Sequence, residues 1–219
     1  MAPLPFWHAS HKSHTFNFYP DAGFSMTDLE LLRNHIEQYI QITDAEFEQF
    51  IVNFHHRKIK KKDFLLREGD TCKYEAFVTK GCFRIYYSDE KGDAQILYFA
   101  VESWWATDID SFINQRPSIL NIEAPEDSEV LLINKPHKDL LYETLPKVEK
   151  MFRIMNQKSL VTFQRRVISS LGKTADKRYL EFIEKYPDLE QRLNQQQLAA
   201  YLGISHEFLS KIRKKLSGK

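Results

Sequence analysis

The chain has 219 residues, of which 42% are hydrophobic, and its formal net charge at pH 7 is +1. This length suits one large or two small domains, each able to bury a core. Two cysteines, Cys72 and Cys82, are too few for a disulfide framework or a cysteine-rich metal site. No apolar run reaches the roughly 18–20 residues of a membrane span, and residues 1–14 lack the apolar core of a secretory signal. We therefore predict a cytoplasmic protein with no membrane partner.

Charge is divided unevenly along the chain. Residues 1–146 contain 15 Lys and Arg against 23 Asp and Glu, a net of −8. Residues 147–219 contain 16 Lys and Arg against 7 Asp and Glu, a net charge of +9. The C-terminal part is therefore the one expected to meet a polyanion.

The pattern of residues 26–54 predicts two helices. Thr27 or Asp28 is expected to cap the first helix. Thr43 is expected to cap the second, and Glu46, three residues later, would complete a capping box.

From Arg57 onward the apolar period changes from 3.6 to 2, which predicts β-strands. We interpret the Lys-rich start of this region as an edge strand, because lysines there block the addition of further strands. Short β-rich runs separated by turns predict an antiparallel roll or barrel. The clearest runs are residues 75–79, 82–87, 94–99, 119–124 and 129–134.

A long helix is predicted for residues 147–171, and it has two apolar faces. A helix that packs against only one core is polar on its far side. We therefore expect this helix to lie between the roll and a partner helix, its own copy in a dimer. The alternative is a helix buried inside one large domain. One face carries Phe152, Leu160, Phe163 and Val167, and the other carries Val148, Met151, Ile154, Met155, Val161 and Ile168.

Residues 192–215 predict two short helices joined by a tight turn. Gly203 lies where a left-handed backbone is needed, and Ser205 is a good N-cap for the second helix. Leu209, Ile212 and Leu216 recur at the spacing of a buried stripe. This layout is typical of a helix-turn-helix whose second helix enters the major groove. A surface helical hairpin with a solvated basic face is the alternative. The face opposite the stripe carries Glu207, Ser210, Lys211 and Lys214.

Together these features resemble the Crp–Fnr superfamily of bacterial transcription regulators. The similarity is sharpest in TADKRYLEFIEKYP and LNQQQLAAYLGISHEFLSKIRKKL, in a version common in Bacteroidetes. FLLREGD followed by YEAFVTKGCFRIYY is similar to a cyclic-nucleotide-binding-type roll. The resemblance implies an α+β fold: an N-terminal antiparallel β-roll (jelly roll) flanked by helices, a dimerisation helix and an all-α, winged-helix-like domain. It also implies a homodimer on a palindromic DNA operator, with RNA polymerase as a candidate partner and no enzymatic activity.

The predicted domain boundaries follow from this resemblance. A poorly ordered extension comes first, and both Met1 and Met26 are candidate starts. The sensor domain, the dimerisation helix and the helix-turn-helix domain follow it. The four segments are residues 1–25, 26–146, 147–171 and 172–219.

The resemblance also implies roles for side chains of the helix-turn-helix. His206, Glu207 and Lys211 correspond to side chains that read base edges, because Glu accepts from cytosine and Lys or His donates to guanine. Lys211 lacks the bidentate fork of an arginine, so weaker discrimination for guanine is expected. The expected phosphate or backbone contacts are Ser205, Ser210, Arg213, Lys214, Gln195 and Gln196.

The stretch ESWWATDIDSFINQRPSILNIEA replaces the phosphate-binding cassette of cyclic-nucleotide binders. Ala106-Thr107 stand in place of Gly-Glu, and Arg116 precedes Pro117 rather than following it. We therefore predict no tight binding of cyclic AMP and no cofactor. The roll either binds an unknown effector or, as we favour, is filled by aromatic side chains such as Trp104, Trp105 and Phe112. The candidate pocket residues are Trp104, Trp105, Thr107, Asp108, Arg116, Ser118, Phe163 and Gln164.

Other classes of protein are less consistent with the sequence. Two cysteines cannot supply an iron–sulfur cluster. His55, His56 and His137 are predicted in exposed loops or helices rather than as haem ligands. A cupin-like metal enzyme needs two His and a Glu on strands, and the predicted strands contain no histidine. The last alternative is a dimeric ligand-sensing module whose C-terminal helices bind protein, against which the net charge of +9 argues.

Overall fold

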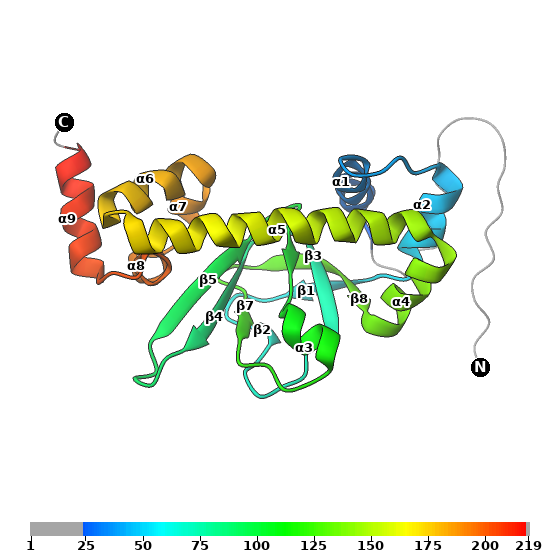
Figure 1. Ribbon diagram of the computed structural model, residues 1–219, viewed down its shortest axis with the longest axis horizontal. Helices are drawn as coiled ribbons and strands as arrows, with labels where there is room; N and C mark the ends of the chain where they lie inside the picture. The colour runs from blue at the N-terminus through cyan, green and yellow to red at the C-terminus, as the bar shows by residue number, and fades with distance from the viewer. Residues whose placement is uncertain (1–23, 218–219) are drawn as a thin grey trace.

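The computed structural model describes residues 24–217. Nearly all of the predicted N-terminal extension therefore lies outside the described residues. A β-roll occupies the centre, with one group of helices at each end. The helix α5 (Pro146–Gly172) runs along the whole molecule and touches both groups (Figure 1).

The remaining elements follow in chain order. The other helices are α1 (Met26–Glu37), α2 (Asp44–Ile51), α3 (Ile109–Asn114), α4 (Lys135–Thr144), α6 (Ala175–Lys185), α7 (Leu189–Arg192), α8 (Gln195–Leu202) and α9 (His206–Ser217). The strands are β1 (His55–Ile59), β2 (Phe64–Leu66), β3 (Tyr74–Lys80), β4 (Phe83–Ser88), β5 (Ala94–Ala100), β6 (Trp105–Ala106), β7 (Asn121–Glu123) and β8 (Ser128–Asn134).

The two N-terminal helices begin at capping boxes. The predicted caps of α1, Thr27 and Asp28, are wrong by two and three residues. Ser25 is the N-cap, and its hydroxyl accepts from the Asp28 amide at 3.1 Å. Asp28 instead supplies the reciprocal carboxylate, which accepts from the Ser25 amide. Thr43 and Glu46 form the predicted capping box of α2.

The roll consists of two four-stranded antiparallel sheets, ordered β1-β8-β3-β6 and β2-β7-β4-β5. The first part of the Lys-rich segment, with Arg57 and Lys58, lies in β1 at the edge of the first sheet, where β1 pairs only with β8. The edge-strand prediction is confirmed for this part, whereas Lys60, Lys61 and Lys62 follow the strand. The region around Trp105, which has no clear periodicity, contains the short strand β6 and the helix α3. Asp108 caps α3 through bonds from the Asp110 and Ser111 amides.

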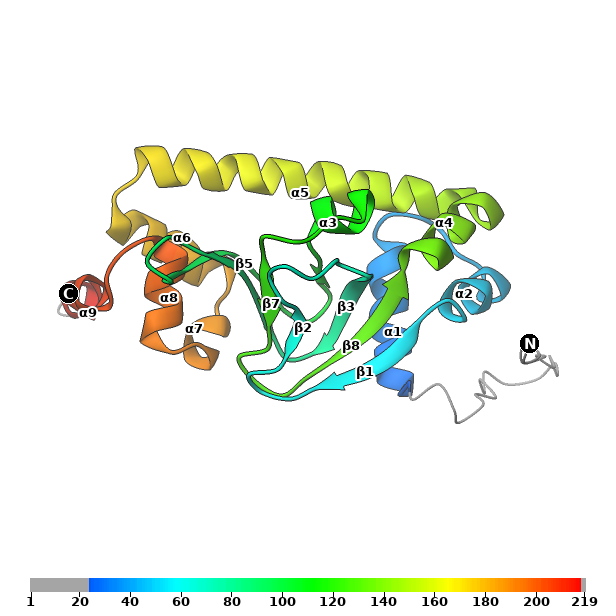
Figure 2. The same ribbon diagram turned by 90° about the horizontal axis from the view of Figure 1, so that it is seen from below.

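The described residues form three apolar cores, and the elements that form them follow one another along α5 (Figure 2). The first lies between α1, α2, α4, the start of α5 and one face of the first sheet. The second fills the roll between its two sheets. The third joins α6–α9 to the outer face of β4 and β5 through Tyr86, Ile96 and Phe99. The C-terminal helices are therefore packed against the roll as well as linked to it by α5.

Burial along α5 changes at its middle. Val148 and Met151 are fully buried in the first core. Further along, Leu160, Val167 and Leu171 are 61%, 57% and 85% exposed. Burial of the whole helix inside one domain, the alternative from the sequence, is therefore not what this chain shows.

Every described element after β8 is a helix. Within residues 135–217 there is consequently no β-wing, and the winged-helix-like part of the fold prediction needs correction. The α+β roll with a C-terminal helical domain is confirmed. No described helix combines the length and the apolar character that crossing a membrane requires.

Candidate functional site

The helix-turn-helix forms from local signals at both of its helices. Asn194 caps α8 by accepting from the Gln197 amide at 2.8 Å. Gly203 then adopts φ 64° and ψ 41°, the left-handed conformation that ends a helix without a Cβ penalty. Ser205 caps α9 by accepting from the Phe208 amide at 3.2 Å. The predicted turn and cap are both present.

The orientation of α9 is fixed by its buried stripe. Leu209 and Ile212 are 0% and 4% exposed and belong to one core with Leu198 and Leu202 of α8. Because successive residues of a helix are rotated by about 100°, the opposite side faces outward. That side presents exposed polar and charged residues: Glu207, Lys211 and Lys214.

At the start of α9, His206 and Glu207 lie side by side. His206 Nε2 is 3.0 Å from Glu207 Oε1, and both side chains are more than half exposed. The Glu207 backbone N–H, and after it the Ser205 hydroxyl, lower the pKa of the Glu207 carboxyl. A carboxylate that stays ionised is a hydrogen-bond acceptor, as contact with a cytosine amino group requires.

Gln195 joins the two helices of the motif. Its side-chain amide donates to the His206 carbonyl at 3.0 Å and to the Ser210 hydroxyl. Gln195 and Ser210, both predicted DNA contacts, are therefore already hydrogen-bonded to each other. The side chain of Gln196 is exposed.

Arg213, a predicted phosphate contact, is also bound by groups within the protein. Its guanidinium contacts Glu190 at 2.9 Å and donates to the Tyr179 hydroxyl at 3.2 Å. It is held against α6 and α7 instead of pointing outward with Lys214. A phosphate contact of Arg213, which stays a prediction, would compete with this ion pair.

Arginines that the sequence pattern did not single out fix the helix-turn-helix against the roll. Arg192 donates to Glu102 at 3.0 Å and also contacts Glu126. Burial alone would raise the pKa of Glu102, but the hydrogen bonds from Arg192 and from the backbone amides of Glu102 and Gly81 together outweigh it, so the net shift is downward. Arg166 of α5 donates to the Ile96 carbonyl at 2.7 Å and to the Tyr201 carbonyl at 3.0 Å. These partners are 35 to 90 residues apart in sequence, so no local motif could have indicated them.

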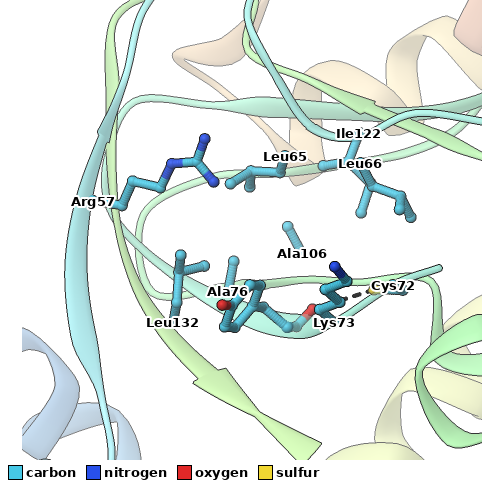
Figure 3. A pocket seen from close by; sticks show the side chains of 10 residues that line it. Arg57, Leu65, Leu66, Cys72, Lys73, Ala76, Ala106, Ile122 and Leu132 are labelled. Carbon is cyan, nitrogen blue, oxygen red and sulfur yellow. Dashed lines mark hydrogen bonds between the residues drawn. The ribbon is translucent and has the colours of Figure 1, made fainter. Parts of the chain in front are cut away.

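The interior of the roll contains a cavity of about 20 Å³ (Figure 3). This is room for about one water molecule, and a nucleotide does not fit. Arg57 points into the space from β1, and apolar side chains such as Leu65, Ile122 and Leu132 form the walls.

The polar residues predicted for an effector pocket have partners within the protein. Asp108 is buried and accepts from the Ser118 hydroxyl at 2.6 Å. The Thr107 carbonyl accepts from the Tyr98 hydroxyl at 2.9 Å. Arg116 is exposed and pairs with the neighbouring Asp110, its Nε donating at 3.0 Å. The structure therefore brings Thr107, Asp108 and Ser118 together and leaves Arg116 outside.

The aromatic residues predicted to fill the roll are divided between all three cores. Phe112 is buried inside the roll as expected. Trp105 packs in the first core, with its ring centroid 5.4 Å from Phe77. Trp104 lies between roll and helix-turn-helix, 5.7 Å from Tyr186. The aromatic pattern could not reveal this, because the core that each side chain enters depends on which distant elements pack beside it.

The two pocket candidates on α5 also separate. The ring of Phe163 packs edge-to-face with the ring of Tyr98 in the roll, with 5.7 Å between the ring centroids. Gln164 is exposed to solvent.

The histidine prediction requires one correction. His55 and His56 lie in β1, not in loops or helices, and His56 Nε2 is 2.9 Å from Glu129. His137 lies in α4 as predicted. Among residues 24–217, no three His, Cys, Asp or Glu side chains converge as metal ligands would.

Comparison with known proteins agrees with this geometry. Residues 56–143 match the cyclic nucleotide-binding domain family, while no curated protein matches the chain in sequence. The c-di-GMP-responsive global regulator CLP of Xanthomonas campestris has a similar structure: TM-score 0.66, 19% identity, covering 80% of this chain and 92% of CLP. FixK2 of Bradyrhizobium japonicum gives a TM-score of 0.66 at 18% identity, covering 75% of this chain and 85% of FixK2. A protein of Eubacterium rectale assigned to the crp/fnr family gives a TM-score of 0.62 at 17% identity, covering 80% of this chain and 84% of that protein.

Proposed function

Because this chain carries a cyclic nucleotide-binding domain within the fold of Crp–Fnr superfamily regulators, we propose that it is a regulator of transcription that binds DNA. It acts as a homodimer on a palindromic operator and catalyses no reaction. The four predicted segments then correspond to an extension, a sensor domain, a dimerisation helix and a DNA-binding domain.

The observation that carries the proposal is the outward face of α9. Leu209 and Ile212 anchor the helix from behind, so Glu207, Lys211 and Lys214 are presented together to solvent. A Lys or Glu at a base edge reads sequence, whereas a Lys at a phosphate fixes register. The net charge of +9 in residues 147–219 supports a polyanionic partner.

The exposed half of α5 supports the dimer. Leu160, Val167 and Ile168 are each more than half exposed on a helix that the roll covers from one side only (Figure 2). Ile109 and Ile113 of α3, below the middle of α5, are also exposed. A second copy packed along α5 buries these apolar surfaces. The two recognition helices of such a dimer meet major grooves about 34–36 Å apart.

The small cavity and the paired polar residues of the roll support the expectation that cyclic AMP does not bind tightly. Calorimetric titration of the purified protein with cyclic AMP is expected to show no micromolar binding. A micromolar dissociation constant would contradict this part of the proposal.

DNA binding is tested by selecting sites from a random double-stranded library with the full chain. We expect an inverted repeat to be enriched, and a gel shift with that repeat to show one complex that weakens steeply as salt rises. Light scattering should give the mass of a dimer. The alternative, C-terminal helices that bind protein, predicts no enriched sequence and no shift even at low salt.

A further inference from the structure

Phe208 is an exposed aromatic residue on the candidate recognition helix. Within the described helices α6–α9, only Leu180 and Phe208 are large apolar residues left substantially exposed, each at 49%. No aromatic ring or cation in the described part of the chain stacks on the Phe208 ring. The domain core therefore does not explain why this position is aromatic.

The position of Phe208 on α9 follows from the buried stripe. Leu209 is the next residue and points into the core, so Phe208 lies about 100° away from it. Lys211, three residues later, is its neighbour on the outward surface. The flank that faces α8 is instead the one that carries Ser210, where Gln195 binds. Phe208 therefore borders the outward face on the side away from α8.

Phe208 also lies in the first turn of α9. Its amide donates to the Ser205 hydroxyl, the N-cap of the helix. In helix-turn-helix complexes the N-terminal residues of the second helix contact the base edges. The ring therefore lies in the turn that enters the groove, next to the charged Glu207.

The major groove offers one apolar group to such a side chain, the 5-methyl group of thymine. A single exposed apolar residue elsewhere on a protein surface is ordinary. Phe208 differs because it borders Glu207 and Lys211, the residues assigned to base reading. From this juxtaposition we propose that Phe208 is a specificity-determining residue that packs against the methyl group of one thymine in each half-site.

This inference rests on the proposed function, and the experiment separates the two. An operator is first selected with the wild-type chain, and each thymine of one half-site is then replaced by deoxyuridine, which lacks only the methyl group. At one position we expect the wild-type dissociation constant to rise about three- to fivefold, the effect of one lost methyl contact. Phe208→Ala should bind the thymine and deoxyuridine operators equally well at that position.

Two variants provide controls. Phe208→Leu keeps an apolar side chain and should retain a preference for thymine. Leu180→Ala removes an equally exposed apolar residue from α6 and should show the wild-type ratio. Thermal melting should match wild type for both Phe208 variants, because the side chain is half exposed.

The inference is overturned if Phe208→Ala keeps the wild-type ratio of thymine to deoxyuridine affinity at every position. It is also overturned if wild type shows no position that responds to deoxyuridine, although the operator is bound. Failure to enrich any operator would contradict the proposed function itself, and with it this inference.

Discussion

The roll and the candidate recognition helix α9 both contain polar residues of the kinds that bind ligands. In the roll these side chains bind one another, whereas on α9 they are exposed. In the roll, Asp108 and Ser118 bind each other and are buried. On α9, Glu207, Lys211 and Lys214 are exposed and face outward together. A polar group satisfied inside the protein stabilises the fold, whereas one left exposed beside others of its kind is available to a partner. Residue type alone does not distinguish the two cases.

The ion pair of Lys138 and Glu75 is the extreme case on the sensor side, by which we mean the predicted sensor domain, residues 26–146. Their side chains are 6% and 5% exposed, and Lys138 Nζ lies 3.8 Å from the centre of the Phe152 ring. Burial lowers the pKa of Lys138, and the Glu75 carboxylate opposes that shift. This pair connects α4 and β3 next to Phe152 of α5, so its disruption should affect stability without touching the proposed DNA-binding face.

The largest expected effect is therefore on the sensor side. Lys138→Met leaves the Glu75 carboxylate buried without its partner, which should lower the free energy of unfolding by about 3–5 kcal/mol. Urea denaturation measures this change. The double variant Lys138→Met with Glu75→Met replaces the pair by apolar side chains and should recover most of the loss. A single variant as stable as wild type would show that the pair is not structural.

The next effect is a pH dependence that also originates on the sensor side. His35 is 7% exposed and accepts from Trp105 Nε1 at 3.2 Å. Burial, with a smaller contribution from the charge of Lys158, lowers the pKa of His35 to about 4. The unfolded chain therefore binds a proton near pH 6.5 that the folded chain does not bind until about pH 4.

The contribution of His35 to the free energy of unfolding should consequently be fully present above pH 6.5. It should decrease by about 3 kcal/mol as the pH falls towards 4. Urea denaturation at a series of pH values measures the slope. His35→Phe should flatten the curve in this window. An unchanged slope in that variant would assign the pH dependence to other groups.

The smallest expected effects lie on the recognition helix and concern affinity rather than stability. Lys211→Ala should weaken binding to the selected operator by about 1–3 kcal/mol and relax preference at one base pair. Lys214→Ala should weaken binding to all sequences alike and reduce the salt dependence. Competition gel shifts at several salt concentrations distinguish the two.

Both lysine variants should unfold like wild type, since both side chains are exposed. If Lys211→Ala binds the operator as wild type does, the assignment of the reading face is incorrect. If either variant is strongly destabilised, the contrast between the two regions does not hold.

The features determined by the sequence alone depend on neighbours in the chain. The Thr43–Glu46 box, the Gly203 turn and the Ser205 cap involve residues at most four positions apart. The alternation of β-strands and the stripe of Leu209 and Ile212 are likewise local periodicities. Such signals are sufficient for the elements and for the outward face of α9, because each arises within one or two turns of backbone.

Only the tertiary structure decided which of the predicted side chains have partners within the protein and which are exposed. Arg213, a predicted phosphate contact, pairs with Glu190, which is 23 residues away in the chain. Trp104 and Trp105 are adjacent in sequence, yet Trp105 packs against Phe77 and Trp104 against Tyr186. The docking of the helix-turn-helix by Arg192 onto Glu102 and Glu126 likewise joins distant segments. Pairings of this kind depend on how the chain closes in space, which neither propensity nor spacing encodes.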